Sequence, residues 1–293
     1  MTDILQAFAA EHECIIGVCD ASPLCPTRLG SGFVPFVSRD INKRVNPEAT
    51  LPGVQSIVAI GVGYCSSLIS HAPGTAQLSS LGTNDDYHPR VKALLRQLVA
   101  ELAPQYNFKH KILVDSPTLC ERSFAQRAGI GFLGRNGLLI SQKFGSRFNI
   151  GLLLTTLAPP AFNHDVSFAG CPPSCHKCIN ACPAGALKDA APLDAVRCIS
   201  YITQKKDRTP QEDSLIGNQL YGCDICQDVC PFNAPRAATT VDPQQWLNMS
   251  DQEFTQKYAH TAMLWQGAEL LRRNANANCQ STAQYYKPTT RKP

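Results

Sequence analysis

The sequence has no long hydrophobic run and little net charge. Its longest apolar stretches, such as residues 56–65, stop well short of the roughly 18 residues that a membrane-spanning helix requires. The net charge of +4 is too small to indicate a nucleic-acid partner by itself. Acidic Asp3, Glu11 and Glu13 stand where a secretory signal would need a basic start and an unbroken apolar segment. We therefore expect a cytoplasmic protein without a membrane anchor.

The composition is that of a folded protein. Hydrophobic residues make up 44% of the 293 residues and charged residues only 17%, a balance that excludes a disordered chain. The length favours one large domain or two modest ones, each able to bury its own core.

The first 160 residues alternate helix-like and strand-like segments. The helical segments are 4–10, 89–103 and 119–128, and the strand-like segments are 15–19, 54–62 and 111–114. Segments 138–140 and 150–156 are expected to pair as a hairpin around Phe144, Gly145 and Ser146. This alternation predicts a layered domain of the α/β or α+β class.

The chain changes character after Leu157-Ala158-Pro159-Pro160. We expect a first domain over 1–160 and a second over 161–236, which is poor in hydrophobic runs and depends on metal to fold. A helical extension follows over 237–293. We expect its helix to continue to about Asn274 and residues 280–293 to be loose.

Cysteine is the unusual component of the sequence. Fourteen cysteines are about 5% of the chain, which is below the range of disulfide scaffolds, and a reducing compartment disfavours disulfides. Eight of them crowd into residues 171–230, which indicates metal. Five others are most simply small buried hydrophobic residues, namely Cys14, Cys19, Cys25, Cys65 and Cys120.

The eight crowded cysteines form two strings that each end in CxxCxxxCP. Two-cluster ferredoxins have this ending, and there the last cysteine of each string binds the other cluster. The pattern predicts two 4Fe-4S clusters with the ligand sets Cys171, Cys175, Cys178, Cys230 and Cys182, Cys198, Cys223, Cys226. Two structural zinc sites remain the alternative. The first spacing is CxxxC, so the loop bulges at Pro172 or Cys171 is a poorer ligand.

A two-cluster segment predicts an electron conduit. A plain ferredoxin would need only the cysteine-rich part, whereas about 160 residues precede it here. We expect this first domain to contain the electron acceptor.

Several motifs in order along the chain resemble those of the epoxyqueuosine reductases, which are cobalamin and iron–sulfur enzymes of queuosine-tRNA synthesis. The motifs are residues 36–47, 51–58, 86–88, 114–117 with Glu121-Arg122, 129–140, 197–201 and 217–223. They lie between about residue 35 and residue 274 and are specific in combination.

The resemblance implies an α+β fold, with a nitroreductase-like cobalamin-binding domain followed by a two-cluster ferredoxin-like domain. It implies reduction of epoxyqueuosine to queuosine at the tRNA wobble position. Electrons would pass from an external donor such as a flavodoxin or ferredoxin through both clusters to cobalt, and we expect a monomer. Asp115 matches the proposed general acid of the family. The candidate cobalamin contacts are Arg122, Gly134, Asn136, Gly145, Ser146 and Tyr201.

The chemistry of an epoxide supports an acid at Asp115. The departing oxygen needs a proton, which a carboxylic acid could supply if burial raised its pKa. Asp115 ends an apolar strand, where catalytic side chains often project. The structural alternative is that Asp115 or Ser116 caps a helix beginning at Pro117.

Two further functions remain open from the sequence. Many members of the family carry a C-terminal helical-repeat domain that helps to hold tRNA, and this sequence reaches Pro293 without one. A corrinoid reductase for a small molecule and an electron-transfer protein without its own substrate are the alternatives. If tRNA binds, the basic groups that could contact phosphates are Arg39, Lys43, Arg44, Lys205, Lys206, Arg208, Arg272, Arg273, Lys287, Arg291 and Lys292.

Overall fold

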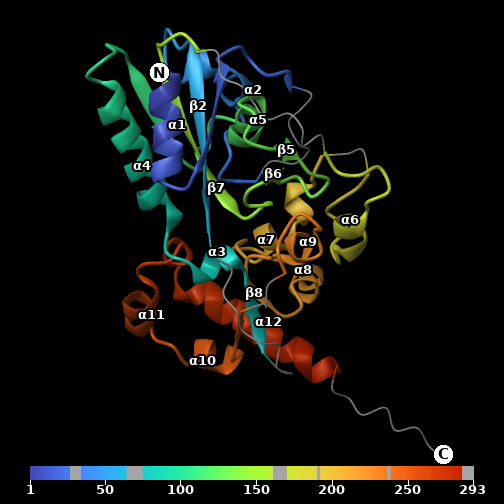
Figure 1. Ribbon diagram of the computed structural model, residues 1–293. Helices are drawn as coiled ribbons and strands as arrows, with labels where there is room; N and C mark the ends of the chain where they lie inside the picture. Colours follow the sequence, from blue (N-terminus) through green and yellow to red (C-terminus); the bar gives the residue numbers. More distant parts are fainter. Residues whose placement is uncertain (27–33, 65–74, 161–169, 190–191, 236–238, 286–293) are drawn as a thin grey trace, which may run out of the picture.

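The computed structural model describes residues 1–26, 34–64, 75–160, 170–189, 192–235 and 239–285. A four-stranded antiparallel sheet forms the centre of the N-terminal part (Figure 1). Its strand order is β1 (Ile15–Asp20), β2 (Ser56–Gly63), β7 (Phe148–Thr155) and β4 (His110–Leu113). The central strands β2 and β7 are continuous apolar runs because both of their faces are covered.

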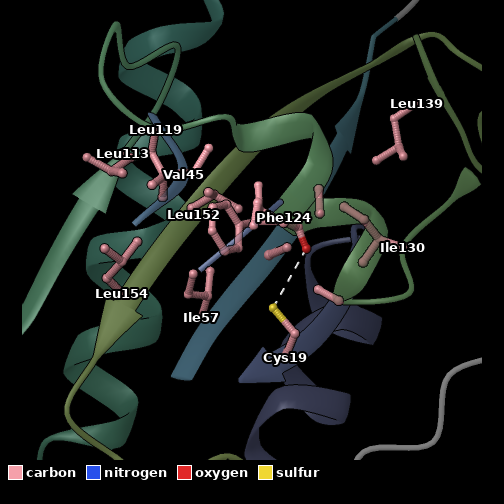
Figure 2. Close-up of a cluster of buried hydrophobic side chains, with 14 of the residues drawn as sticks. Cys19, Val45, Ile57, Leu113, Leu119, Phe124, Ile130, Leu139, Leu152 and Leu154 are labelled. Carbon is pink, nitrogen blue, oxygen red and sulfur yellow. Dashed lines mark hydrogen bonds between the residues drawn. The ribbon is translucent and has the colours of Figure 1, made fainter. Parts of the chain in front are cut away.

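Helices pack on both faces of this sheet. The helices α1 (Thr2–Glu11) and α4 (Tyr87–Leu102) cover one face, where Phe8 and Leu95 lie in one core with Ile60 of β2. The short helix α5 (Glu121–Arg127) covers the other face, where Phe124 packs among Ile57, Leu152 and Leu154 (Figure 2). The fold of this part is therefore α+β, as expected.

Glycines in the sheet let α4 and α5 approach closely. A Cβ atom on Gly17 of β1 would collide with the carbonyl oxygen of Ala128 at the end of α5. A Cβ atom on Gly151 of β7 would lie 2.6 Å from Cγ1 of Val91 on α4. These contacts fix the positions of the two helices that carry the candidate site described below.

The structure contradicts the predicted hairpin between segments 138–140 and 150–156. The strand β6 (Leu139–Ile140) pairs with β5 (Phe132–Leu133), whereas β7 enters the central sheet between β2 and β4. The eight residues of β7 are apolar enough to be buried on both faces, so they take a central position that a two-residue partner could not cover.

The cysteine-rich part consists of short helices joined by turns. They are α6 (Lys177–Ala181), η3 (Ala195–Arg197), α7 (Ile199–Ile202), α8 (Pro210–Leu215) and α9 (Ile225–Asp228). Only α8 begins with a capping box, formed by Thr209 and Glu212 among these described helices. Such short helices have little stability of their own, which agrees with a segment that depends on metal.

A small second sheet joins all three parts of the chain. Its middle strand β3 (Ala76–Leu78) runs parallel to β8 (Gln219–Tyr221) and antiparallel to β9 (Thr239–Val241). The short helix α3 (Ser80–Thr83), η2 (Pro47–Ala49) and α2 (Ile41–Val45) complete the elements before residue 100. One hydrophobic core accordingly includes Ala76, Leu220 and Trp246, which come from all three parts of the chain.

The C-terminal extension packs against this second sheet. It contains α10 (Pro243–Leu247), α11 (Asp251–Tyr258), η4 (Leu264–Gln266) and α12 (Ala268–Tyr285). Trp246, Phe254 and Leu271 share a core with Leu220 of β8. The helix α12 continues past the expected end near Asn274, and residues 286–293 of the expected loose tail lie outside the described residues. None of the helices in the described part is long and apolar enough to cross a membrane.

A buried asparagine ties α12 to the cysteine-rich part. The Asn274 side chain is fully buried, and its Nδ2 donates to the carbonyl oxygens of Thr203 and Leu220, both at 2.8 Å. Its Oδ1 accepts a hydrogen bond from Arg208.

We predict that Asn274→Ala lowers the free energy of unfolding by about 1–3 kcal/mol, because it leaves these carbonyl groups buried without a donor. Anaerobic thermal unfolding should show a decrease of several degrees in Tm. The control is Asn276→Ala, which removes an exposed asparagine from the same helix. Equal effects of the two substitutions would contradict the assignment.

Candidate functional site

Asp115 lies two residues after the end of β4 in an unusual backbone conformation. Its φ is +52°, in the left-handed region that non-glycine residues seldom occupy. The carboxylate of Glu121 accepts hydrogen bonds from two consecutive backbone amides, those of Asp115 at 3.1 Å and Ser116 at 2.8 Å. The Asp115 side chain remains 70% exposed, so a bound molecule can reach its carboxylate.

Two side chains from the first turn of α4 face the Asp115 carboxylate. The Tyr87 hydroxyl donates a hydrogen bond to Oδ2 at 3.0 Å, and Nε2 of His88 lies 3.7 Å from the same oxygen. On its other side, Nδ1 of His88 is 2.7 Å from Oδ1 of Asp86, the residue that caps α4. The motif Asp86-Tyr87-His88 thus meets Asp115 across the end of the sheet.

The C-terminal extension also contacts this motif. The backbone N–H of Asp86 donates to the carbonyl oxygen of His260 at 2.7 Å. Nearby, Nε1 of Trp265 donates to the Tyr221 hydroxyl at 3.3 Å. Residues beyond 236 therefore support the site that the first 160 residues form.

Asp115 and His88 shift each other's pKa in opposite directions. The ion pair with His88, at 3.7 Å, lowers the pKa of Asp115 although the surrounding protein partly desolvates this exposed carboxylate, and the hydrogen bond from Tyr87 lowers it further. The pair with Asp115 in turn raises the pKa of His88, and Asp86 adds to the rise. The expectation that burial raises the pKa of Asp115 is wrong, because the partners outweigh burial. Burial and the charge of Asp115 raise the pKa of Tyr87, which keeps its proton.

The helix-cap alternative for Asp115 is also wrong. The helix α5 begins at Glu121 with Cys120 at the N-cap position, so neither Asp115 nor Ser116 caps it. The hydroxyl of Ser116 instead lies 2.8 Å from that of Thr118 within the turn. This removes the principal structural explanation for Asp115.

The charge of Arg122 acts on both Asp115 and one of the cysteines. Its guanidinium group donates to the carbonyl oxygen of Gly137. Its charge adds to the effect of His88 in lowering the pKa of Asp115. Burial raises the pKa of the Cys198 thiol, and the Arg122 charge opposes that rise. One cation thus acts on both the candidate acid and a candidate cluster ligand.

Three other candidate cobalamin contacts lie in the surrounding elements. Asn136 is buried, its Oδ1 accepts from the Leu138 amide at 3.1 Å, and its Nδ2 has no hydrogen-bond partner among the described residues. Gly134 packs against Asn136 and Ile140, with no room for a Cβ atom. Tyr201 follows Cys198 on α7, and its ring lies edge-on to exposed Phe36 at 5.9 Å.

The structure places Gly145 and Ser146 elsewhere, at the contact with the second cysteine string. The Ser146 amide donates to Oδ1 of Asn233 at 2.7 Å, and its hydroxyl donates to Oε1 of Gln227 at 3.0 Å. The adjacent Arg147 forms an ion pair with Asp228 at 3.0 Å. The polar groups of Ser146 are thus engaged within the chain.

Several of the eight crowded cysteines act electrostatically on one another. Burial raises the pKa of Cys178, and the thiols of Cys171 and Cys230 raise it further. Burial likewise raises the pKa of Cys230, with added contributions from Cys171 and Cys175. Cys171 also packs against the hydrophobic cluster that contains Cys230, and the full division into two ligand sets stays a prediction.

The thiols of the second expected set also raise one another's pKa values. Burial raises the pKa of Cys223 to about 12, and Cys198 and Cys182 raise it further. Burial raises the pKa of Cys226 well above its usual value, and Cys223, Cys198 and, from the other set, Cys178 add to the rise. The two expected sets thus mix the strings and lie within electrostatic range of each other.

Backbone amides at Ser200 and Tyr201 donate hydrogen bonds to Cys198, which lowers the pKa of its thiol against the larger effect of burial and favours the thiolate form.

Of the remaining cysteines, Cys14 and Cys19 are buried as expected, and the Cys19 thiol contacts the Phe124 carbonyl at 3.7 Å (Figure 2). Cys25 is exposed, so its expected burial is wrong. Cys120 is half-buried beside Ser123, and Cys65 lies outside the described residues.

Two family models match the chain. Residues 44–116 match the model "Epoxyqueuosine reductase QueG, DUF1730", and residues 171–233 match the "4Fe-4S double cluster binding domain". The first ends next to Asp115, and the second contains all eight crowded cysteines. The cysteine-rich part is therefore a double 4Fe-4S domain and not a pair of zinc sites.

Solved structures with the same fold are also epoxyqueuosine reductases. One with a tRNA-Tyr epoxyqueuosine-modified stem loop has a TM-score of 0.84 at 28% identity, covering 96% of this chain and 80% of that one. A Bacillus subtilis structure, whose catalytic aspartate loop is swung out of the active site, has a TM-score of 0.84 at 29% identity. It covers 96% of this chain and 81% of that one.

Curated relatives agree with these structures. The epoxyqueuosine reductase of Bacillus subtilis (strain 168) is 35% identical over 260 residues, covering 82% of this chain and 66% of that protein. The chain thus spans about two thirds of the length of that relative. The Lactococcus garvieae (strain Lg2) enzyme is 32% identical over 273 residues, covering 84% of this chain and 76% of that protein. The chain belongs to the epoxyqueuosine reductase family.

Proposed function

We propose that this protein reduces epoxyqueuosine to queuosine in the anticodon of tRNA, with cobalamin and two 4Fe-4S clusters as cofactors. The observation that carries the proposal is the position of Asp115. Its exposed carboxylate faces His88 and Tyr87, and Arg122 connects it electrostatically to Cys198 of the second cysteine set. A structure of a relative with an epoxyqueuosine-modified stem loop supports tRNA as the substrate.

The groups around Asp115 can deliver a proton to the epoxide. Conversion of an epoxide to an alkene releases the oxygen as water and consumes electrons and protons in equal number. The carboxylate of Asp115 is ionised at rest, so we infer that protonated His88 holds the proton and Asp115 transfers it to the departing oxygen. The catalytic aspartate loop of the Bacillus subtilis relative supports a loop aspartate in this role.

The residues present fit a bound cobalamin. The unpartnered Nδ2 of buried Asn136 can donate to an acceptor on the corrin, and Arg122, Gly134 and Tyr201 lie in the neighbouring elements. When bound, cobalamin supplies the reducing metal centre. We assign Gly145 and Ser146 to the contact between the sheet and the cluster domain, since their partners are Asn233 and Gln227.

We infer the direction of electron transfer from the two proposed cysteine sets. The set that contains Cys198 lies on the Arg122 side and serves as the inner cluster, whereas the set that contains Cys171 serves as the outer one. The helices α6 and α9, which carry ligands of both sets, pack together. We propose a flavodoxin or ferredoxin as the external donor of a cytoplasmic, monomeric enzyme.

Several of the cations that could contact tRNA already form ion pairs within the protein. Lys205 pairs with Glu212 at 2.7 Å, Arg208 with Asp213 at 2.6 Å, and Arg272 with Asp251 at 2.8 Å. Arg39 and Lys43 are exposed at the start of α2, where Lys43 forms only a long, solvent-exposed ion pair with Asp40, at 3.9 Å. We therefore favour these two cations for phosphate contacts.

We predict that Asp115→Asn lowers turnover of an anticodon stem loop carrying epoxyqueuosine by about 10²–10⁴-fold, the usual contribution of a positioned acid. Iron and cobalamin contents should stay at the wild-type level. Mass spectrometry of the nucleosides measures queuosine formed. The control, Asp251→Asn, removes a surface carboxylate on α11. Wild-type turnover by Asp115→Asn would remove Asp115 from the mechanism.

The raised pKa of His88 predicts a decline of turnover at alkaline pH. The imidazole carries its proton below this raised pKa and loses it as the pH rises through that value. Single-turnover rates measured from about pH 6 to about pH 9 should fall across this range, and His88→Gln should remove this dependence. A His88→Gln profile that superposes on the wild-type profile would contradict the role of His88.

Paired cysteine substitutions test the division of the ligands. We predict that Cys230→Ser reduces iron from about eight to about four atoms. Adding Cys175→Ser should cost no further cluster, because both ligands belong to one set, whereas adding Cys226→Ser should remove the second. Anaerobic iron analysis and electron paramagnetic resonance of the reduced protein measure this. Cys279→Ser is the control, and the opposite pattern would indicate that each string binds its own cluster.

A further inference from the structure

The Glu121 carboxylate binds the backbone of Asp115 and makes no contact with its carboxylate, which Tyr87 and His88 face instead. Glu121 is the first residue of α5, and its side chain reaches back over the turn between β4 and the helix. Its Oε2 accepts from the Asp115 amide at 3.1 Å, and its Oε1 accepts from the Ser116 amide at 2.8 Å. One carboxylate therefore fixes two consecutive peptide units where the chain leaves the strand.

Asp115 depends on such support because of its left-handed backbone. A non-glycine residue at a φ of +52° persists only when the surrounding structure determines it. In this conformation the Asp115 carboxylate faces Tyr87 and His88 of α4. A turn that relaxed to an ordinary φ would redirect the carboxylate away from both partners.

A charged group at position 121 is electrostatically unfavourable. Burial raises the pKa of Glu121 to about 7, the nearby Asp115 carboxylate adds to the rise, and the two amides and His88 oppose it. A neutral side chain at position 121 would avoid the repulsion between the two carboxylates. The two oxygens of Glu121 nevertheless accept from two amides at once.

We propose that Glu121 is a positioning residue for Asp115, which fixes the left-handed turn by accepting both backbone amides. The kinetic consequence rests on the proposed function of the protein. The effect on the turn itself does not, so the two can be tested separately.

Hydrogen–deuterium exchange of the holoprotein tests the structural step. Glu121→Gln keeps one acceptor oxygen, and Glu121→Ala removes both. We expect amide exchange in the peptide covering 113–120 to become about 10-fold faster in the first variant and about 100-fold faster in the second. Glu253→Gln on α11 is the matched control, because Glu253 likewise accepts a backbone amide, from Ser250 at 2.8 Å. Unchanged exchange at 113–120 in both Glu121 variants would overturn the proposal.

Turnover of the epoxyqueuosine stem loop tests the kinetic step. We expect Glu121→Ala to lower kcat by about 10- to 100-fold with KM and cofactor contents unchanged. In an Asp115→Asn background the same substitution should cost less than about 2-fold, because Glu121 acts through Asp115. Equal losses in both backgrounds would overturn the positioning role. If the wild-type protein does not turn over the stem loop, the proposed function fails, and the exchange result still decides on Glu121.

Discussion

The proposed exchange of one cysteine between the two strings is the constraint on which the cysteine-rich part depends. In this division Cys182, which ends the first string, joins the set of Cys198 and Cys223, whose pKa values it raises, and Cys230, which ends the second string, joins the set of Cys171. Neither proposed set can assemble from one string alone. The short helices α6 and α9 are consequently held together, and their stability is coupled to the clusters.

Hydrogen bonds and an ion pair connect the cysteine-rich part to the domain that contains Asp115. The loop after Cys230 binds Ser146 through Asn233, and Arg147 pairs with Asp228 on α9. On the other side, the chain after residue 236 returns to Asp86 through the His260 carbonyl. The site around Asp115 is thus supported by the sheet, by the cluster domain and by the C-terminal extension.

Much of this architecture is readable from the sequence where periodicity is strong. The apolar runs of β2 and the helical spacing of α4 locate both elements, and the CxxCxxxCP endings predict the double 4Fe-4S domain that the family model matches. The sequence does not predict strand β3, because a strand of three residues is too short to show an alternating hydrophobic pattern. The end of α12 is missed because Asn274 and Asn278 bury polar side chains on carbonyl groups, which hydrophobic patterns do not record.

The chemistry of the candidate acid is less predictable than its position. The location of Asp115 at a strand end follows from the sequence, but its pKa depends on His88, whose contact is created only by folding. The same is true of Glu121, because the hydrogen bonds that its carboxylate accepts from amides five and six residues earlier have no effect on hydrophobic periodicity.

The central claim is that Asp115, cobalamin and the two clusters act on one substrate. Its most direct test is to give anaerobically reconstituted protein, with and without cobalamin, an anticodon stem loop containing epoxyqueuosine and a chemical reductant. Mass spectrometry should detect queuosine only when cobalamin is present. Binding of cobalamin without formation of queuosine, with both clusters intact, would contradict the claim.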